Sequence, residues 1–193
     1  AKELELRLGV KACGYLPRMD ECTLESRHLG LVTAAEVENL RGRMQRLAQQ
    51  AEQSIDLDAL LDIANTAAPL TFIPPVLPES RETVRIGVAY DKAFCFYYAD
   101  SLGLLQRLGA ELVPFSPMTD ARLPEGLDGV YLGGGYPELY TAQLSRNTTM
   151  RQSVREAVLS GLPCIAECGG FMYLTQSIAD AAMTGALPGG CFD

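Results

Sequence analysis

One stretch, residues 162–174, places strong limits on how this chain can fold. A short apolar run ends in Glu167, Cys168, Gly169 and Gly170, and apolar residues then resume at helical spacing. The nucleophile elbow has this order: a strand, then a tight turn that carries the nucleophile, then a helix. Glycines permit the sharp turn, and free N–H groups at a helix start favour a thiolate. The stretch therefore predicts a strand–turn–helix unit with Cys168 as a candidate nucleophile.

Two residues of this stretch have a second interpretation. Free cysteine is among the residue types most often buried, so Cys168 also fits a structural role in the core. Glu167 fits a pocket acid, a group that orients the elbow, or a carboxylate that complements the helix dipole. The local pattern leaves these alternatives open because an elbow is recognised by its structural context.

Strand-like and helical patterns alternate before this stretch. The strand-like runs are 84–90, 111–115, 129–132 and 162–166, and the helical patterns are 96–108, 138–144 and 147–160, with Asn147 as a cap. Such alternation predicts a parallel sheet with helices on both faces, a three-layer α/β/α fold. Ligands of these sheets bind at the carboxyl ends of the strands, so we expect the loop after 129–132 and Cys168 at one edge.

That loop begins with three glycines, and residues 133–138 read Gly-Gly-Gly-Tyr-Pro-Glu. Backbone N–H groups in such a loop can cradle phosphate or stabilise an oxyanion. A phosphate loop would need a following Lys and Ser or Thr, and the spacing does not match a dinucleotide fingerprint. Beside a candidate nucleophile the oxyanion interpretation is favoured. A turn that serves packing alone is the alternative, although glycine runs in strands indicate close approach.

The first part of the chain has a different pattern. An apolar stretch over 6–16 predicts a strand, and 27–32 predicts another extended piece. Thr33 and Glu36 have capping-box spacing, so we expect a helix from Thr33 to about Gln53.

A second, shorter helix and a linker are predicted next. Asp56 is a candidate cap for the helix, and four prolines then fall between positions 69 and 78. Because proline removes donors and favours extended backbone, we expect a linker over 66–83 between domains 1–65 and 84–193.

Composition disfavours several functional classes. Residues 1–83 carry 9 basic and 13 acidic side chains and residues 84–193 carry 7 and 11, so no basic face for nucleic acid is expected. No apolar run is long enough to span a bilayer, and no secretory signal pattern is present. The six cysteines lack paired or metal-ligand spacing, so we expect no metal site and a reduced, cytoplasmic protein.

Several motifs of the chain occur together in one family. They are Gly-Gly-Gly-Tyr-Pro-Glu at 133–138, the region of Asn147 and Met150, Gly-Leu-Pro at 161–163 and Glu-Cys-Gly-Gly-Phe-Met-Tyr-Leu at 167–174. With them, residues 84–193 resemble the class I glutamine amidotransferase domain of the cobyrinic acid a,c-diamide synthases. Arg-His-Leu-Gly-Leu at 27–31 is similar to a stretch near the end of that family's synthetase domain, and it favours this branch over the cobyric acid synthases.

The resemblance implies a glutaminase chemistry. A cysteine thiolate attacks the side-chain amide of glutamine, forms a γ-glutamyl thioester and releases ammonia. The implied site residues are Cys168 as nucleophile, backbone N–H groups around Gly134, Gly135 and Gly169 as oxyanion hole, and Tyr136 and Glu138 at the border of the glutamine pocket.

The resemblance also implies a second activity. A dethiobiotin-synthetase-like domain would use ATP and Mg²⁺ to activate the a and c carboxylates of cobyrinic acid, which ammonia then converts to amides. Residues 1–65 would be the mostly helical tail of this ATP-binding α/β domain, and Arg27 and His28 belong to its motif.

The chain departs from the family pattern in two ways. It has no P-loop, and its single histidine is His28, whereas the family's catalytic histidine follows the elbow helix. We therefore expect a fragment whose amidotransferase domain is incomplete, which holds no cofactor of its own and is inactive in isolation. The truncated sheet predicts an exposed edge and a possible homodimer.

Two alternatives remain open on the sequence. The acceptor could be a related tetrapyrrole, such as nickel sirohydrochlorin or hydrogenobyrinic acid. The chain could instead be a non-catalytic module in which an amidotransferase-like sheet serves for docking.

Overall fold

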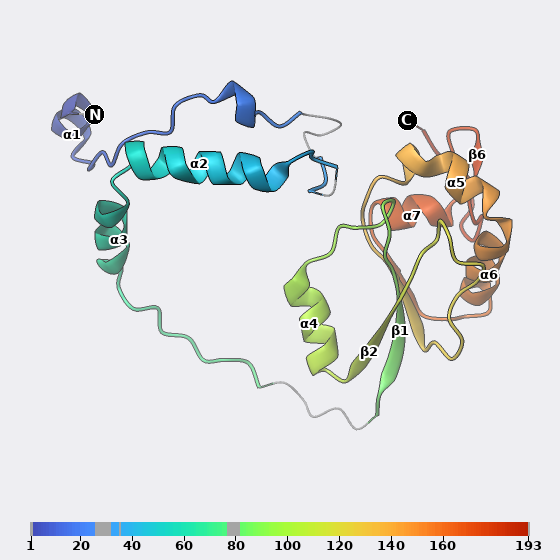
Figure 1. The fold of residues 1–193 in the computed structure, drawn as a ribbon. Coiled ribbons are helices and arrows are strands. Elements are labelled where there is room, and N and C mark those ends of the chain that lie inside the picture. The colour runs from blue at the N-terminus through green and yellow to red at the C-terminus, as the bar shows by residue number, and fades with distance from the viewer. Residues whose placement is uncertain (1, 26–31, 35, 77–81, 193) are drawn as a thin grey trace. The chain divides into compact units, whose positions relative to one another are not determined.

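The computed structural model describes residues 2–25, 32–34, 36–76 and 82–192. The predicted extended piece 27–32, with Arg27 and His28, lies outside the described residues except for its last position. The chain divides into two compact units, Ala1–Ile73 and Pro74–Asp193 (Figure 1).

The second unit is built on a four-stranded parallel sheet of order β2-β1-β3-β4. The strands are β1 (Val84–Ala89), β2 (Ala110–Phe115), β3 (Gly129–Leu132) and β4 (Cys164–Ala166). In the register, Val84 pairs with Ala110, Ile86 with Gly129, and Val130 with Cys164. Because all four strands run in one direction, their carboxyl ends lie at the same edge of the sheet, where ligands of such sheets bind.

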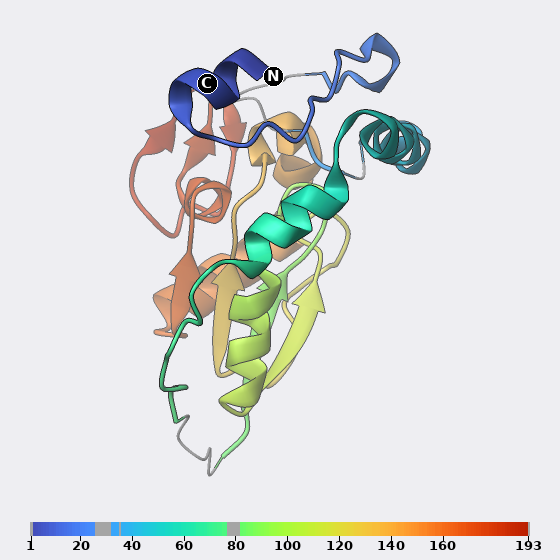
Figure 2. The same cartoon turned by 90° about the vertical axis from the view of Figure 1, so that its left-hand side faces the viewer.

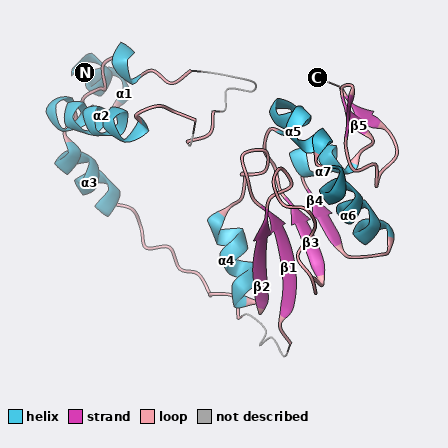
Figure 3. Ribbon diagram, turned by 45° about the vertical axis from the view of Figure 1, so that its right-hand side comes forward, coloured by secondary structure: helices cyan, strands magenta, loops and turns pink. Residues whose placement is uncertain are grey.

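Helices lie on both faces of this sheet (Figures 2 and 3). Helix α4 (Ala99–Arg107) contacts β2 on one face. The core on the other face is formed with α5 (Thr141–Arg146), α6 (Thr148–Leu159) and α7 (Gly169–Leu174). The predicted α/β fold with helices flanking a parallel sheet is confirmed.

The main core lies between the sheet and helices α5 to α7. Its most buried members include Ala89, Val130, Leu132, Leu144, Met150, Val154 and Tyr173. Each fully buried large apolar side chain contributes about 1.5–3 kcal/mol. This core fixes the strand ends from which the candidate site is built.

The four predicted strands are confirmed. Two neighbouring features need explanation, the late start of helix α4 and a proline within strand β2. Helix α4 begins at Ala99 instead of 96 because Phe96 forms an extended bridge, its N–H donating to the Gly134 carbonyl at 3.0 Å. Strand β2 contains Pro114, which is tolerated because β2 is an edge strand.

The predicted helix over 138–144 forms as a short 3₁₀ helix, η2 (Pro137–Tyr140), followed by α5. The predicted cap of the next helix is confirmed: the Asn147 side chain accepts a hydrogen bond from the Met150 N–H at 3.4 Å. The same side chain donates to the Pro117 and Asp120 carbonyls at 2.9 and 2.8 Å. Asn147 therefore joins α6 to the loop after β2.

A small second sheet follows α7 and was not predicted. It has the order β6-β5-β7, with β5 (Ser177–Ile178), β6 (Ala181–Ala182) and β7 (Gly190–Cys191). Strands of two residues are too short to show an alternating pattern.

The secondary-structure elements of the first unit among the described residues are helices, as expected. They are α1 (Lys2–Leu8), η1 (Asp20–Cys22), α2 (Leu40–Ser54) and α3 (Leu57–Asn65). The strand predicted over 6–16 is wrong, because residues up to Leu8 are helical and Glu3 forms an ion pair with Arg7 one turn later. A helix satisfies its own backbone hydrogen bonds, whereas a strand here would need a neighbour.

The predicted start of the long helix at Thr33 is also wrong. The Glu36 carboxylate does accept from the Thr33 N–H and hydroxyl, at 3.3 and 2.7 Å. Asn39 then adopts a left-handed conformation with φ 50°, so the helix begins only at Leu40. The cap predicted at Asp56 is confirmed, since its carboxylate accepts from the Ala59 N–H at 3.0 Å. None of the helices among the described residues has the length and apolar character needed to cross a membrane.

The Asn147 contacts lead to a prediction about stability. Asn147→Ala should lower the free energy of unfolding by about 2 kcal/mol, because it removes a helix cap and leaves two carbonyls without a donor. Urea denaturation followed by circular dichroism measures this. Thr149→Ala, at an exposed position in the same helix turn, should change stability by less than about 0.5 kcal/mol. Equal stabilities of the two variants would contradict the proposed bracing role.

Candidate active site

Cys168 lies in the turn between β4 and α7 with an unusual backbone conformation. Its φ is 48° and its ψ is −110°, and it is one of three non-glycine residues with positive φ among the described residues. Such conformations cost about 1–3 kcal/mol and persist where the surrounding structure enforces them. Of the six cysteines, Cys168 alone is exposed, and none is in a disulfide. The strand–turn–helix order is confirmed, and the alternative of a buried core cysteine is wrong.

Three backbone hydrogen bonds hold this turn in place. The Glu167 N–H donates to the Leu132 carbonyl at 2.9 Å, which extends the pairing of β4 with β3. The Gly170 N–H donates to the Glu167 carbonyl at 2.8 Å, and the Met172 N–H to the Cys168 carbonyl at 3.1 Å. A Cβ at position 170 would lie 2.0 Å from the Leu132 carbonyl oxygen, so only glycine fits there.

Two glycines of the loop after β3 are required by their neighbours, and the third shows how close the loop lies to the elbow. A Cβ on Gly133 would lie 2.4 Å from the Tyr97 ring. Gly135 has φ 156°, and a Cβ there would lie 2.0 Å from the Ala93 carbonyl oxygen. A Cβ on Gly134 would lie 3.7 Å from the Cys168 Cβ, so the loop and the elbow are in contact.

The structure brings together four of the residues predicted for the site. Gly169 follows Cys168 directly, and a Cβ on it would lie 3.1 Å from the Gly135 carbonyl oxygen. Cys168, Gly134, Gly135 and Gly169 therefore form one cluster at the carboxyl ends of β3 and β4. As the first residue of α7, Gly169 has a backbone N–H without a partner inside the helix.

The other predicted pocket residues lie close by in sequence. Tyr136 is buried and its ring packs edge-on against Phe96, with 5.2 Å between centroids. Glu138 is half-buried in η2. Their role at the border of a glutamine pocket remains a prediction.

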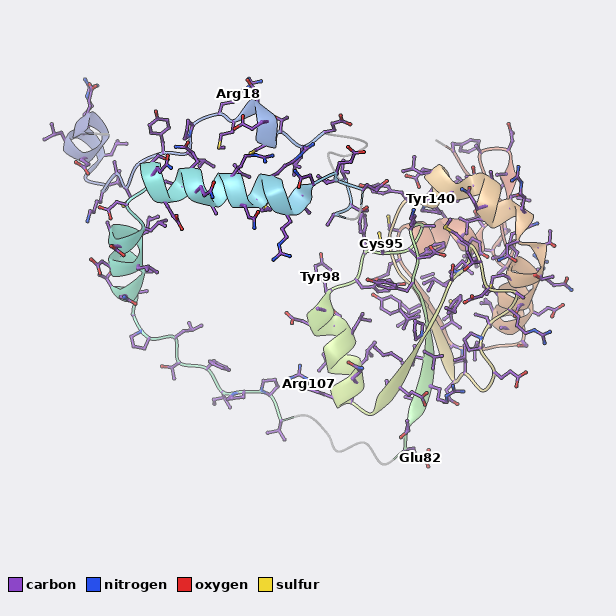
Figure 4. All side chains as sticks on the ribbon, in the orientation of Figure 1. Arg18, Glu82, Cys95, Tyr98, Arg107 and Tyr140 are labelled. Atoms are coloured by element: carbon purple, nitrogen blue, oxygen red, sulfur yellow. The ribbon has the colours of Figure 1, made fainter. Side chains whose placement is uncertain are left out.

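Tyr97 has a structural role that the sequence did not reveal. Its hydroxyl donates to the Ala89 carbonyl at 2.5 Å and accepts from the Gly133 N–H at 2.8 Å. It thereby joins the ends of β1 and β3. Burial raises the pKa of Tyr97, so its hydroxyl keeps the proton that it donates. The neighbouring Tyr98 is 82% exposed and stands at the N-cap position of α4, where its side chain makes no capping hydrogen bond (Figure 4).

Glu167 makes a side-chain contact that the sequence left open. The Tyr131 hydroxyl donates to its carboxylate Oε2 at 2.5 Å. Partial burial, together with this carboxylate, raises the pKa of Tyr131 to about 12. The interaction ties the residue before Cys168 to strand β3.

Cys164 differs from Cys168 although it lies only four positions earlier. It is half-buried, packs against the main core, and burial raises the pKa of its thiol. A thiol with a raised pKa forms little thiolate and is a poor nucleophile.

A groove with a volume of about 580 Å³ lies on the α4 face of the sheet. It is mostly apolar, with Leu104, Leu105 and Ile165 in its walls and Glu167 at its border. Cys168 and the glycine loop do not line it, so we do not assign glutamine to this groove.

The bridging role of Tyr97 generates a prediction. Tyr97→Phe should lower the free energy of unfolding by about 1–3 kcal/mol, because the Gly133 N–H and the Ala89 carbonyl lose their partner. Tyr98→Phe is the matched control and should change it by less than about 0.5 kcal/mol. Chemical denaturation of both variants measures the difference. If Tyr97→Phe is as stable as the wild type, the hydroxyl bridge does not hold the loop.

Comparisons with known proteins show to which family the chain is similar. Residues 85–189 match the model of the CobB/CobQ-like glutamine amidotransferase domain. The cobyrinate a,c-diamide synthase of Caldanaerobacter subterraneus subsp. tengcongensis is 45% identical over 180 residues, which are 92% of this chain and 39% of the relative.

Two further relatives carry the same name. That of Dehalococcoides mccartyi is 43% identical over 197 residues, and that of Methanothermobacter thermautotrophicus is 41% identical over 189 residues. Each match covers 97% of this chain and 42% of the relative, so the chain spans less than half the length of these curated relatives. With more than half of its residues matching the family model, the chain belongs to the family of CobB/CobQ-like glutamine amidotransferase domains.

Proposed function

We propose that the second unit is the glutamine-hydrolysing domain of a cobyrinate a,c-diamide synthase. The observation that carries this proposal is the geometry at Cys168. An exposed thiol lies on a residue with φ 48° and ψ −110°, against the Gly134 backbone. A nucleophile on a strained turn beside a glycine-rich loop suits acyl transfer.

In the proposed reaction the Cys168 thiolate attacks the carbonyl carbon of the glutamine side-chain amide. The carbon–nitrogen bond breaks, and the nitrogen takes up a proton and leaves as ammonia. The γ-glutamyl thioester that remains is hydrolysed by water, which releases glutamate and restores the thiol. We assign no residue as the base, because the single histidine of the sequence, His28, lies outside the described residues.

The backbone around the nucleophile supplies the proposed oxyanion hole. Negative charge develops on the amide oxygen during the attack, and N–H groups aimed at it lower the barrier. We propose that those of Gly134, Gly135 and Gly169 serve this purpose, since the three glycines cluster about Cys168. Tyr136 and Glu138 would border the bound glutamine.

The acceptor of the ammonia is proposed from the relatives' names. The matched relatives are named cobyrinate a,c-diamide synthases, which favours the a and c carboxylates of cobyrinate over nickel sirohydrochlorin or hydrogenobyrinic acid. Arg27 and His28 would belong to the synthetase side of the longer protein. None of the six cysteines is in a disulfide, which suits the proposed cytoplasmic location.

ATP and Mg²⁺ are the proposed cofactors of the longer protein. The sequence has no P-loop. Across the described ranges, no group of three or more His, Cys, Asp or Glu side chains is placed to hold a metal ion. The residues present do not fit a nucleotide–metal site, so no step is assigned to them.

We also propose that two copies of the chain associate through the β4 side of the sheet. Strand β4 is last in the strand order, and Ile165 in it is 61% exposed. Light scattering should show a mass that rises with concentration toward a dimer, and Ile165→Glu should weaken the association. A monomer mass at every concentration would contradict this part of the proposal.

The nucleophile is tested in a protein of the relatives' full length that contains this sequence. Cys168→Ala should reduce glutamine-dependent amidation by more than about 1,000-fold, because the thioester cannot form. Amidation with free ammonia should continue, since it bypasses the thioester. Cys164→Ala, which removes the half-buried neighbouring thiol, should retain both activities. Glutamine use that survives in Cys168→Ala would overturn the proposed function.

A further inference from the structure

Tyr131 and Glu167 occupy adjacent strand ends on the same face of the sheet. Tyr131 pairs in register with Ile165, and Glu167 lies two residues beyond Ile165. Side chains two positions apart along a strand point to the same face, so Glu167 reaches the Tyr131 hydroxyl diagonally. The resulting hydrogen bond, 2.5 Å long, joins β3 to the residue immediately before Cys168.

Tyr131 is itself held by the residue that holds the glycine loop. Its ring packs edge-on against Tyr97, with 5.2 Å between centroids and 89° between planes. The Tyr97 hydroxyl accepts a hydrogen bond from the Gly133 N–H, and the Tyr97 ring fills the space in which a Cβ on Gly133 would lie. One pair of tyrosines therefore contacts both sides of the candidate site, the elbow through Glu167 and the loop through Gly133.

Stability alone is a weak reason for the Glu167 contact. Glu167 is exposed, and exposed charged contacts contribute little to folding. The backbone of Glu167, in contrast, is fixed on both sides, by the Leu132 carbonyl and by the Gly170 N–H. A side-chain tether at this position restricts the rotation of the turn that carries Cys168.

We propose that Glu167 and Tyr131 form a positioning pair for the nucleophile. Their hydrogen bond holds the elbow so that Cys168 stays against the Gly133–Gly135 loop. The inference deepens the proposed function and rests on it for the identity of the substrate, whereas the tether itself can be measured without any substrate. In a second interpretation the Glu167 charge, and not its hydrogen bond, would matter, because a nearby carboxylate disfavours a thiolate.

Three variants separate these interpretations. Tyr131→Phe removes the donor and keeps the ring that packs on Tyr97. Glu167→Ala removes the acceptor, and Glu167→Gln removes the charge but keeps an oxygen that accepts from Tyr131. Tyr98→Phe, at an 82% exposed position, is the matched control for loss of a tyrosine hydroxyl.

The first readout is inactivation of this chain by the chloroketone analogue of glutamine, with the label located by mass spectrometry. Tyr131→Phe and Glu167→Ala should lower the maximal rate of labelling at Cys168 by about tenfold or more. The half-saturating concentration of the reagent should change little, because a displaced nucleophile reacts slowly with a normally bound reagent. Glu167→Gln and Tyr98→Phe should react like the wild type. Equal maximal rates in wild type and Tyr131→Phe would overturn the proposal. Faster labelling in both Glu167→Ala and Glu167→Gln would overturn it in favour of the charge interpretation.

The second readout is amide hydrogen exchange at Gly170, whose N–H donates to the Glu167 carbonyl. Exchange should be about tenfold faster in Tyr131→Phe and Glu167→Ala and normal in Glu167→Gln, because loosening of the tether opens this bond. If the wild-type chain shows no saturable labelling while the exchange rates follow this order, the proposed function fails and the positioning pair stands. Unchanged exchange in Tyr131→Phe would overturn the pair whatever the labelling shows.

Discussion

The parallel pairing of β3 with β4 is the constraint on which the candidate site depends. It places two chain reversals, the Gly133–Gly135 loop and the Cys168 turn, at one edge of the sheet. Parallel strands need crossover connections, and here η2, α5 and α6 form the connection while they build the core on one face. The same packing that stabilises the fold therefore brings a thiol and a glycine-rich backbone together.

The strain at Cys168 is supported by its neighbours. The main chain on both sides of it is hydrogen-bonded, to β3 through Glu167 and to the first turn of α7 through Gly170. Glycines are needed at 133, 135 and 170 because ring or backbone atoms occupy the space that a Cβ would fill. Strain that is enforced in this way is typical of functional sites.

Much of the second unit could be predicted from its residues, and less of the first. In the second unit, apolar runs bounded by glycine or proline predicted the four strands. Two short polar residues predicted helix starts through local hydrogen bonds, Asn147 for α6 in the second unit and Asp56 for α3 in the first. The helix start at 33 and the strand at 6–16 were wrong because these patterns are local. Asn39 adopts a left-handed conformation, so the helix begins at Leu40, and residues up to Leu8 belong to α1. The Tyr97 bridge and the Tyr131–Glu167 bond join residues 36 positions apart, so no spacing rule could reveal them.

The most direct test of the account is the reactivity of each cysteine in this chain, measured by limited alkylation with iodoacetamide and mass spectrometry, with and without glutamine. Cys168, the exposed thiol beside the glycine loop, is expected to react first of the six, and glutamine is expected to slow its reaction selectively. Faster alkylation of another cysteine, or no protection of Cys168 by saturating glutamine, would contradict the assignment of Cys168 as the glutamine nucleophile.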